Sequence, residues 1–399
     1  MNAKSIPNGT ITSAKGFLAG ATCAGLKTKG GLDLGILYSE VPCVAVGLCT
    51  TNRIKAAPVA LCQKHLANRR AQAIVVNAGC ANACTGERGL ADATEMANLA
   101  AGRLGIAPED VLVASTGVIG TRLPIELISG SMDRVALSKE GGHELAQAIR
   151  TTDTYAKEIA VAAEGGESII GGIAKGAGMI HPNLATFLCF LATDAAIDAD
   201  FLERALREAV DLSFNMITID GETSPNDTVL ILANGVAGNE IISEGTREAE
   251  AFQVALKEVC TYLAKCIAGD GEGATKLIEV TVEGALSLAD ARVAARTVAS
   301  SPLVKAAIHG NDPNWGRIIA ALGRSGAEIE GSKIDLFLNN ICLMEEGSPH
   351  PFDRDEVRAA MRATEVPIRI GLNLGSFTAT AWGCDLAEEY VTINSEYTS

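Results

Sequence analysis

The sequence predicts a mixed α/β (α+β) fold, built as a sandwich of several layers with a smaller α/β domain at the C-terminus. Short apolar runs bounded by glycine or polar residues, as in buried strands, alternate along the chain with stretches of helical spacing. The length of 399 residues also allows about two or three domains. We therefore expect a main catalytic domain over 1–285 and a C-terminal domain over 286–399.

The apolar runs place the expected elements in order. Strands are expected within 32–60 and at 72–77, 110–115, 156–163, 168–174, 187–192, 229–233 and 276–283, then within 333–344 and twice before the C-terminus. Helices are expected at 90–104, 125–138, 143–150, 198–212, 248–268 and 354–363, with two more after 286. Asp198 is the expected N-cap of its helix, and Gly269 is expected to end the longest helix before a flexible acidic loop.

Composition excludes several classes of protein. Hydrophobic residues make up 48% and charged residues 20%, which is typical of a globular chain. The net charge of −15, without a basic patch, argues against nucleic acid or an anionic membrane as a partner. No apolar run approaches the roughly 18 residues of a membrane span. The apolar run 16–26 resembles a signal peptide, but glycines and a threonine dilute it, so we expect a cytoplasmic protein.

The 11 cysteines stand singly in apolar or helical surroundings, and their number is odd, which favours reduced, buried thiols over a disulfide framework. Cys80 and Cys84 form the only tight pair, and no second pair completes a tetrahedral metal site. The glycines at 269, 271 and 273 do not follow a strand, so they are no dinucleotide fingerprint, and the phosphate-loop and serine-hydrolase elbow motifs do not occur. We expect no metal.

The stretch 174–194 carries the strongest chemical signal. Gly176 and Gly178, followed by Pro182 and Asn183, predict a sharp turn directly before Thr186 and a buried strand. A hydroxyl at the start of a buried strand suits a chain that cuts itself there, because the new N-terminal threonine would carry both a nucleophile and an α-amine base. The alternative is a threonine that merely opens a strand, where β-branched residues are common.

Several separate stretches resemble one family, the ornithine acetyltransferases (glutamate N-acetyltransferases) of arginine biosynthesis. Lys-Gly-Ala-Gly-Met-Ile-His-Pro-Asn-Leu-Ala-Thr at 175–186 resembles the family's self-cleavage motif, and Ala-Ser-Thr-Gly-Val-Ile-Gly at 114–120 its oxyanion segment. Further signatures are matched at 50–58, 220–227, 311–317 and 391–399, so the resemblance covers essentially the whole chain. Two positions depart from the family pattern: Leu184 stands where methionine is usual, and Ser399 where threonine is common.

The resemblance implies a mechanism. Thr186 would be the nucleophile, and cleavage between Ala185 and Thr186 would give an α chain, 1–185, and a β chain, 186–399. Thr116 and Gly117 would form the oxyanion hole. The substrate-binding positions would be Thr152, Lys175, Thr186, Glu272, Asn394 and Ser399. The fold would be that of the self-processing aminopeptidases and ornithine acetyltransferases.

The implied reaction is double displacement: N²-acetylornithine acetylates Thr186, and glutamate then takes the acetyl group. No cofactor is implied, acetyl-CoA is a possible second acetyl donor, and the assembly is expected to contain two α and two β chains. Two alternatives remain open, a self-cleaving hydrolase on the same fold and a silent, uncleaved relative. A cysteine acyltransferase using Cys189 is disfavoured, because Cys189 lies inside an apolar strand without a convincing histidine partner.

Overall fold

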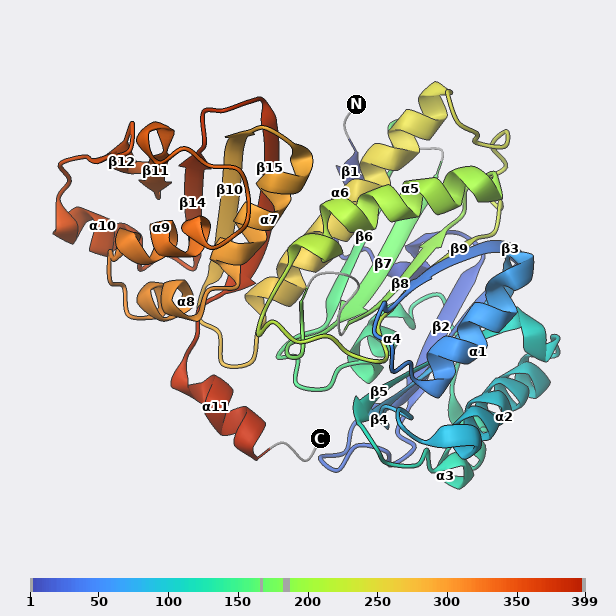
Figure 1. Cartoon of the computed structure of the whole chain (residues 1–399). Helices are drawn as coiled ribbons and strands as arrows, with labels where there is room; N and C mark the ends of the chain where they lie inside the picture. The colour runs from blue at the N-terminus through green and yellow to red at the C-terminus, as the bar shows by residue number, and fades with distance from the viewer. Residues whose placement is uncertain (1–2, 166–167, 182–186, 397–399) are drawn as a thin grey trace.

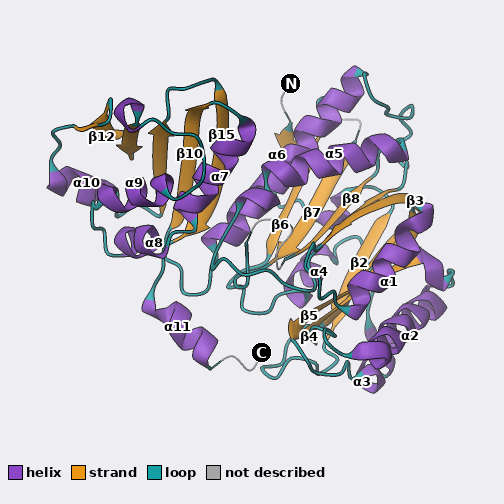
Figure 2. Cartoon of the chain, in the orientation of Figure 1, coloured by secondary structure: helices purple, strands orange, loops and turns teal. Residues whose placement is uncertain are grey.

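The computed structural model describes residues 3–165, 168–181 and 187–396, and the strands in this part of the chain form two β-sheets (Figures 1 and 2). Among the described residues, one sheet has nine strands and the other six. Helices pack on both sheets. The arrangement confirms the predicted mixed α/β fold of several layers.

The larger sheet has the strand order β1-β6-β7-β8-β9-β3-β4-β5, with β2 paired to β3. Its pairs are antiparallel except β8 with β9 and β4 with β5, which are parallel. Strand β3 changes register between Tyr38 and Cys43 and pairs with β9 only beyond this shift, so it joins the two halves of the sheet. The strands are β1 (Lys4–Ser5), β2 (Phe17–Thr22), β3 (Leu34–Cys49), β4 (Arg70–Cys80), β5 (Val111–Val118), β6 (Lys157–Ala162), β7 (Ile169–Lys175), β8 (Leu188–Thr193) and β9 (Thr228–Ala233).

Strands β8 and β9 are buried on both faces, which explains their uninterrupted apolar sequences. Along β8, Cys189 and Leu191 belong to the core beneath α5 and α6, whereas Leu188 and Phe190 belong to the core shared with β4 and β5. Because side chains alternate along a strand, one apolar run serves both cores. The predicted strand at 187–192 is confirmed.

Helices cover both sides of the larger sheet. Helix α6 packs on β6 and β7 and against α5, α4 packs on β2 and β3, and α1 and α2 pack on β5. Their bounds are α1 (Ala57–His65), α2 (Gly86–Leu104), α3 (Ile125–Ser129), α4 (Gly142–Ala148), α5 (Ala199–Leu212) and α6 (Arg247–Gly269). The carboxylate of Asp198 accepts a hydrogen bond from the backbone N–H of Phe201, which confirms the predicted N-cap of α5.

The smaller sheet has the order β13-β12-β11-β14-β10-β15. Its strands are β10 (Leu277–Ala285), β11 (Asp335–Leu338), β12 (Ile341–Glu345), β13 (Ser348–Pro349), β14 (Glu365–Gly371) and β15 (Phe377–Cys384). Its helices are α7 (Leu288–Ala299), α8 (Pro302–His309), α9 (Trp315–Gly323) and α10 (Arg354–Ala360), and α11 (Glu388–Ser395) follows the sheet. Strand β10 belongs to this sheet, so the chain joins the smaller sheet at Leu277, before position 286. The division into two domains at 285/286 stays a prediction.

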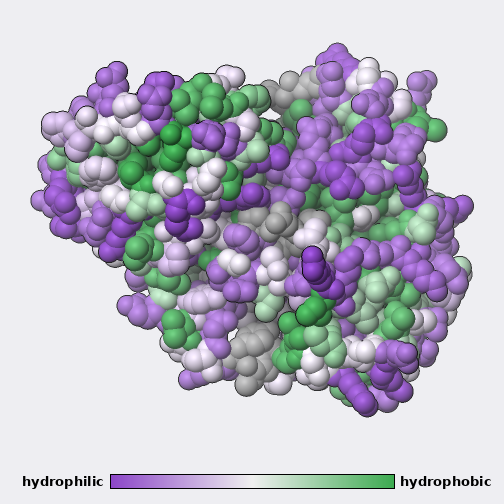
Figure 3. Space-filling view, in the orientation of Figure 1, coloured by the Kyte–Doolittle hydropathy of each residue, from purple (hydrophilic) through white to green (hydrophobic). Residues whose placement is uncertain are grey.

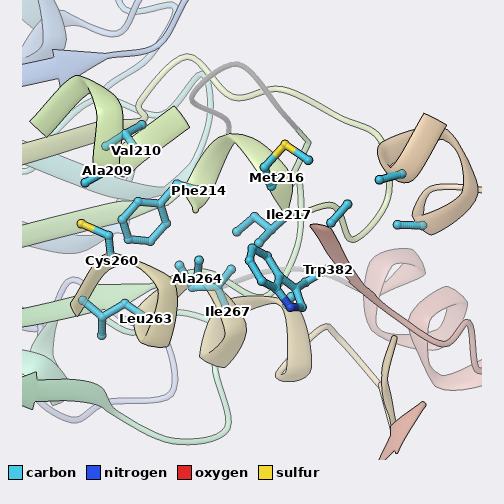
Figure 4. Packing of buried hydrophobic residues seen from close by; sticks show 14 of the residues in the cluster. Ala209, Val210, Phe214, Met216, Ile217, Cys260, Leu263, Ala264, Ile267 and Trp382 are labelled. Carbon is cyan, nitrogen blue, oxygen red and sulfur yellow. The ribbon is translucent and has the colours of Figure 1, made fainter. Parts of the chain in front are cut away.

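The two sheets share one core around α6. Phe214, which follows α5, packs near Leu263 of α6, and Trp382 of β15 lies beside Ile267 (Figure 4). The indole N–H of Trp382 also donates to Glu279 Oε2 at 2.7 Å. The C-terminal end of α6, from which the chain runs to Glu272, is therefore held by both sheets.

The structure differs from the sequence predictions at several places. Residues 17–22, within the run that resembles a signal peptide, form β2 in register with β3. The helix expected over 125–138 stops at Ser129, where Gly130 caps it. Helices α1 and α11 lie outside the predictions, and α7, α8 and α9 stand where the sequence predicts two helices. Helix α11 has no buried residue, so it lacks an apolar stripe that could reveal it.

Two expectations about exposure are wrong. All 11 cysteines are free thiols. The cysteines were expected to be buried, but Cys23 and Cys84 are exposed. Helix α6 ends at Gly269 as expected, with Asp270 as its C-cap. The loop that follows, which was expected to be flexible, is packed into the protein, with Asp270 and Glu272 buried. On the face in Figure 3, hydrophilic residues spread over both halves of the molecule and hydrophobic residues occur in small groups. Within the described ranges, no helix is long and apolar enough to cross a bilayer.

Candidate functional site

The six predicted site residues that the structure describes line one pocket of about 280 Å³. They come from β5, the loop before β6, the end of β7, the loop after α6, and α11: Thr116, Gly117, Thr152, Lys175, Glu272 and Asn394. Phe187 and Leu188, which follow the predicted nucleophile in the sequence, line the same pocket. The fold therefore brings together residues from separate motifs, as the resemblance implied.

Three predicted site residues, Ala185, Thr186 and Ser399, lie outside the described residues. Their roles stay predictions. On the two sides of the predicted cleavage site, β7 ends at Lys175 and β8 begins at Leu188, and these two residues pair in the sheet.

Lys175 and Thr116 form the centre of the pocket's polar wall. Both side chains are buried, and Lys175 Nζ lies 3.2 Å from Thr116 Oγ1. An ammonium group can only donate, so Thr116 Oγ1 must accept from it, and the Thr116 hydroxyl keeps its own hydrogen for another acceptor. Burial lowers the pKa of Lys175, an effect that the negative charge of Asp153 opposes. This geometry can present a hydroxyl donor to a developing negative oxygen in the pocket.

The backbone geometry and the crowding beside β4 favour glycine at position 117. Its φ of +131° lies in a region that other residues rarely adopt, and a Cβ there would stand 2.3 Å from the backbone carbon of Gly79. Strand β5 consequently approaches β4 closely where its residues reach the pocket. Gly117 lines the pocket at this close approach, and its role in an oxyanion hole stays a prediction.

Replacing Gly117 by alanine is expected to destabilise the fold by about 1–3 kcal/mol, through backbone strain and overpacking. The measurement is the midpoint of urea unfolding. Gly102→Ala is the matched control, because Gly102 lies within α2 and a Cβ added there would meet no atom within 4 Å, so the change should stabilise by up to about 1 kcal/mol. An unchanged midpoint for Gly117→Ala would contradict the strained, crowded geometry.

Glu272 forms the acidic side of the pocket. Its backbone N–H donates to Ala177 O at 2.8 Å, and its Oε2 accepts from Asn394 Nδ2 at 2.7 Å. A Cβ on Gly178 would lie 2.6 Å from Glu272 Oε2, so that glycine makes room for the carboxylate. The pocket thus has a buried ammonium on one wall and a carboxylate on another.

Asp220 anchors the glycine-rich turn that precedes the predicted cleavage site. Its two carboxylate oxygens accept from the backbone N–H groups of Met179, at 2.6 Å, and Ile180, at 2.9 Å. Tyr390 of α11 donates to the same carboxylate at 3.3 Å. One acidic residue therefore ties the turn to the C-terminal helix.

The structure adds Ser224, Asn226 and Asp227 to the site, and all three are buried pocket residues. Asn226 Nδ2 donates to Ala81 O at 2.6 Å and to Ser115 O at 2.9 Å, while its Oδ1 has no hydrogen-bond partner among the described residues. In the sequence, the three residues belong to the family signature at 220–227, for which the resemblance implies no role. The signal was the density of polar residues directly before a buried strand.

Cys189 is a poor candidate for a nucleophile. Cys189 is fully buried in β8, and burial raises the pKa of its thiol well above the usual value, which disfavours a thiolate nucleophile. Among the described residues, no group of three or more histidine, cysteine or acidic side chains could hold a metal ion.

The fold and the pocket define a two-sheet α/β protein whose small site has opposite charges on different walls. The model of the ArgJ family matches residues 18–399. The arginine biosynthesis bifunctional proteins ArgJ of Dehalococcoides mccartyi and Symbiobacterium thermophilum are each 53% identical, over 99% and 98% of this chain respectively and 98% of each relative. The chain belongs to the ArgJ family, which confirms the family expected from the motifs.

A crystal structure of the arginine biosynthesis bifunctional protein from Bacillus halodurans has the same fold over the part that it shares. It is 44% identical, with a TM-score of 0.51, and the match covers 52% of this chain and 98% of that chain.

Proposed function

We propose that this protein transfers an acetyl group from N²-acetylornithine to glutamate, giving ornithine and N-acetylglutamate, in arginine biosynthesis. The observation that carries the proposal is the gathering of Thr116, Gly117, Thr152, Lys175, Glu272 and Asn394 around one pocket beside Phe187. The pocket volume of about 280 Å³ is small for a ligand-binding site, which suits single amino acids as substrates. Relatives at 53% identity named arginine biosynthesis bifunctional proteins support the same pathway.

The charges of the pocket complement such substrates. An amino acid presents an α-carboxylate, and ornithine adds a δ-ammonium. We assign the carboxylate to Lys175 and Thr152, and the ammonium to Glu272, whose orientation Asn394 holds through the hydrogen bond of 2.7 Å. Opposite charges on separate walls orient a substrate as well as bind it.

The chemistry is double displacement. Thr186 Oγ attacks the acetyl carbonyl of N²-acetylornithine while the α-amine of Thr186 takes the hydroxyl proton. Thr116 and Gly117 donate to the oxyanion, and the C–N bond then breaks as the proton passes to the departing amine of ornithine. The amine of glutamate attacks the acetyl-threonine ester by the same steps in reverse, which frees Thr186.

The nucleophile is formed by self-cleavage. Thr186 Oγ attacks the carbonyl of Ala185, the peptide nitrogen leaves as the α-amine, and water hydrolyses the resulting ester. The products are the chains 1–185 and 186–399. The solved Bacillus halodurans chain supports this division, since nearly its whole length matches only about half of this chain.

Further proposals complete this function. The reaction needs no cofactor, and acetyl-CoA serves as an alternative acetyl donor to glutamate. The protein acts in the cytoplasm as an assembly of two α and two β chains.

The test is an assay of the purified protein with N²-acetylornithine and glutamate. Ornithine and N-acetylglutamate should form in equal amounts, with the parallel double-reciprocal plots of a double-displacement reaction. Acetyl-CoA with glutamate is assayed separately. Release of free acetate without glutamate would replace the proposal by a hydrolase, and failure to form any product would favour a silent relative.

A further inference from the structure

Lys157 lies behind the pocket and does not line it. It is the first residue of β6, and its side chain is fully buried, with 0% exposure. Its ammonium contacts two carboxylates, Asp153 Oδ1 at 2.7 Å and Asp270 Oδ2 at 2.5 Å. The Tyr155 ring lies 4.9 Å from the same nitrogen. Because burying a charge is costly, an ammonium paired so completely needs a structural or functional reason.

Asp153 links Lys157 to two sides of the pocket. Its Oδ1 also accepts from the backbone N–H of Gly176 at 2.6 Å, directly after Lys175. Its Oδ2 accepts from the N–H of Thr151 at 3.1 Å, next to Thr152. One carboxylate thus holds the backbone of the loop before β6 and the end of β7.

Asp270 links Lys157 to the third side. It caps α6 two residues before Glu272. Its carboxylate accepts from the backbone N–H of Thr154 at 3.0 Å and from the Thr154 hydroxyl. The loop that carries Glu272 is therefore joined to the loop that carries Thr152, and Lys157 lies at the junction.

Charges of both signs are buried together in this cluster. The carboxylates Asp153 and Asp270 lie among the lysines Lys157 and Lys175, and all four residues are buried. Burial opposes ionisation of Asp153, but the charges of Lys157 and Lys175 and the Gly176 hydrogen bond outweigh it and lower the pKa of Asp153. Without Lys157 the two carboxylates would repel each other, and Lys175 would be drawn toward Asp153 and away from Thr116.

We propose that Lys157 is a positioning residue that holds the loops of Thr152, Lys175 and Glu272 around the substrate without touching it. The hydrogen bonds described above support the positioning role of Lys157. The expected effects on kinetics rest on the proposed acetyl transfer.

The first test compares Lys157→Met with wild-type protein. The kcat/KM for N²-acetylornithine should fall on the order of 100-fold, with KM rising as well as kcat falling, because binding groups and the oxyanion donor both move. Lys157→Arg keeps the charge and should recover part of the loss. Lys276→Met is the matched control, since Lys276 is a buried lysine that donates to Ile308 O and Asn311 Oδ1, away from the pocket.

The second test follows pH. Burial lowers the pKa of Lys175; the charge of Asp153 opposes this effect, and the charge of Lys157 adds to it. The surroundings of Lys175 also include Asp227, Glu272 and Lys27. We expect the decrease of kcat/KM at alkaline pH, the alkaline limb, to follow deprotonation of Lys175. This limb should move to higher pH in Lys157→Met, which removes a positive charge near Lys175, and to lower pH in Asp153→Asn, which removes a negative charge. A purely structural defect would not move the limb in opposite directions.

The third test does not depend on activity. Amide hydrogen exchange at Thr151, Thr154 and Gly176, whose N–H groups donate to the two carboxylates, should become faster in Lys157→Met and stay unchanged in Lys276→Met. If wild-type protein fails to transfer acetyl while this exchange pattern appears, the proposed function falls and the positioning role stands. If Lys157→Met folds and its amide exchange is unchanged, the positioning role is overturned. The role is also overturned if the wild-type protein is active and Lys157→Met has the same kinetic constants and the same alkaline limb of its pH profile.

Discussion

Replacing Thr186 by alanine is expected to leave a single uncut chain of 399 residues that transfers no acetyl group. The reason is chemical: alanine has no hydroxyl, so neither the ester that cuts the chain nor the acetyl ester can form. Activity should fall below detection. An intact-mass spectrum of the purified protein, run beside the wild type, shows whether the chain is cut at Ala185/Thr186.

Two controls separate this chemistry from folding. Thr186→Ser keeps a hydroxyl and should still cut itself and transfer acetyl. Thr193→Ala removes a buried threonine at the other end of β8 and should be cut normally. Cleavage of Thr186→Ala would place the nucleophile elsewhere, and an uncut wild-type chain would contradict the N-terminal threonine mechanism.

The parts of the fold that the sequence predicts are those with local signals. The apolar run of β8 and the glycines at 176 and 178 can be recognised without tertiary information, because a buried strand and a turn each depend on residues that are neighbours in the sequence. Helix α11 escapes prediction because it buries no residue and its contacts with the site come from distant parts of the chain: Asn394 donates to Glu272, 122 residues earlier, and Tyr390 donates to Asp220. The hydrophobic periodicity of the sequence gives no sign of such contacts.

The same limit applies to the site. The motifs, read with the family resemblance, name Thr116, Lys175 and Glu272, and the structure places them around one pocket. The pair Lys157–Asp270 is different, because it joins residues 113 apart and neither lies in a recognised motif. A buried charge can be recognised only after the fold shows what surrounds it, since a lysine in an isolated sequence is most often exposed.

Replacing Thr116 by valine is expected to lower kcat by about 10²–10³-fold, equivalent to about 2.7–4 kcal/mol of barrier, with little change in KM. Valine keeps the volume of the side chain but cannot donate to an oxyanion. The donor is available in the wild type because Lys175 occupies a lone pair of Thr116 Oγ1, at 3.2 Å, and so leaves the hydroxyl hydrogen for the pocket.

Thr116→Ser tests that reasoning, since serine restores the hydroxyl and should recover most of kcat. The valine variant should also cut itself more slowly, because attack on the Ala185 carbonyl develops the same kind of negative oxygen as attack on an acetyl group. The measurements are steady-state kinetics on cleaved protein and the cut fraction over time by mass spectrometry. If KM rose while kcat held, Thr116 would bind the substrate's ground state alone, and the oxyanion role would pass to the backbone N–H of Gly117.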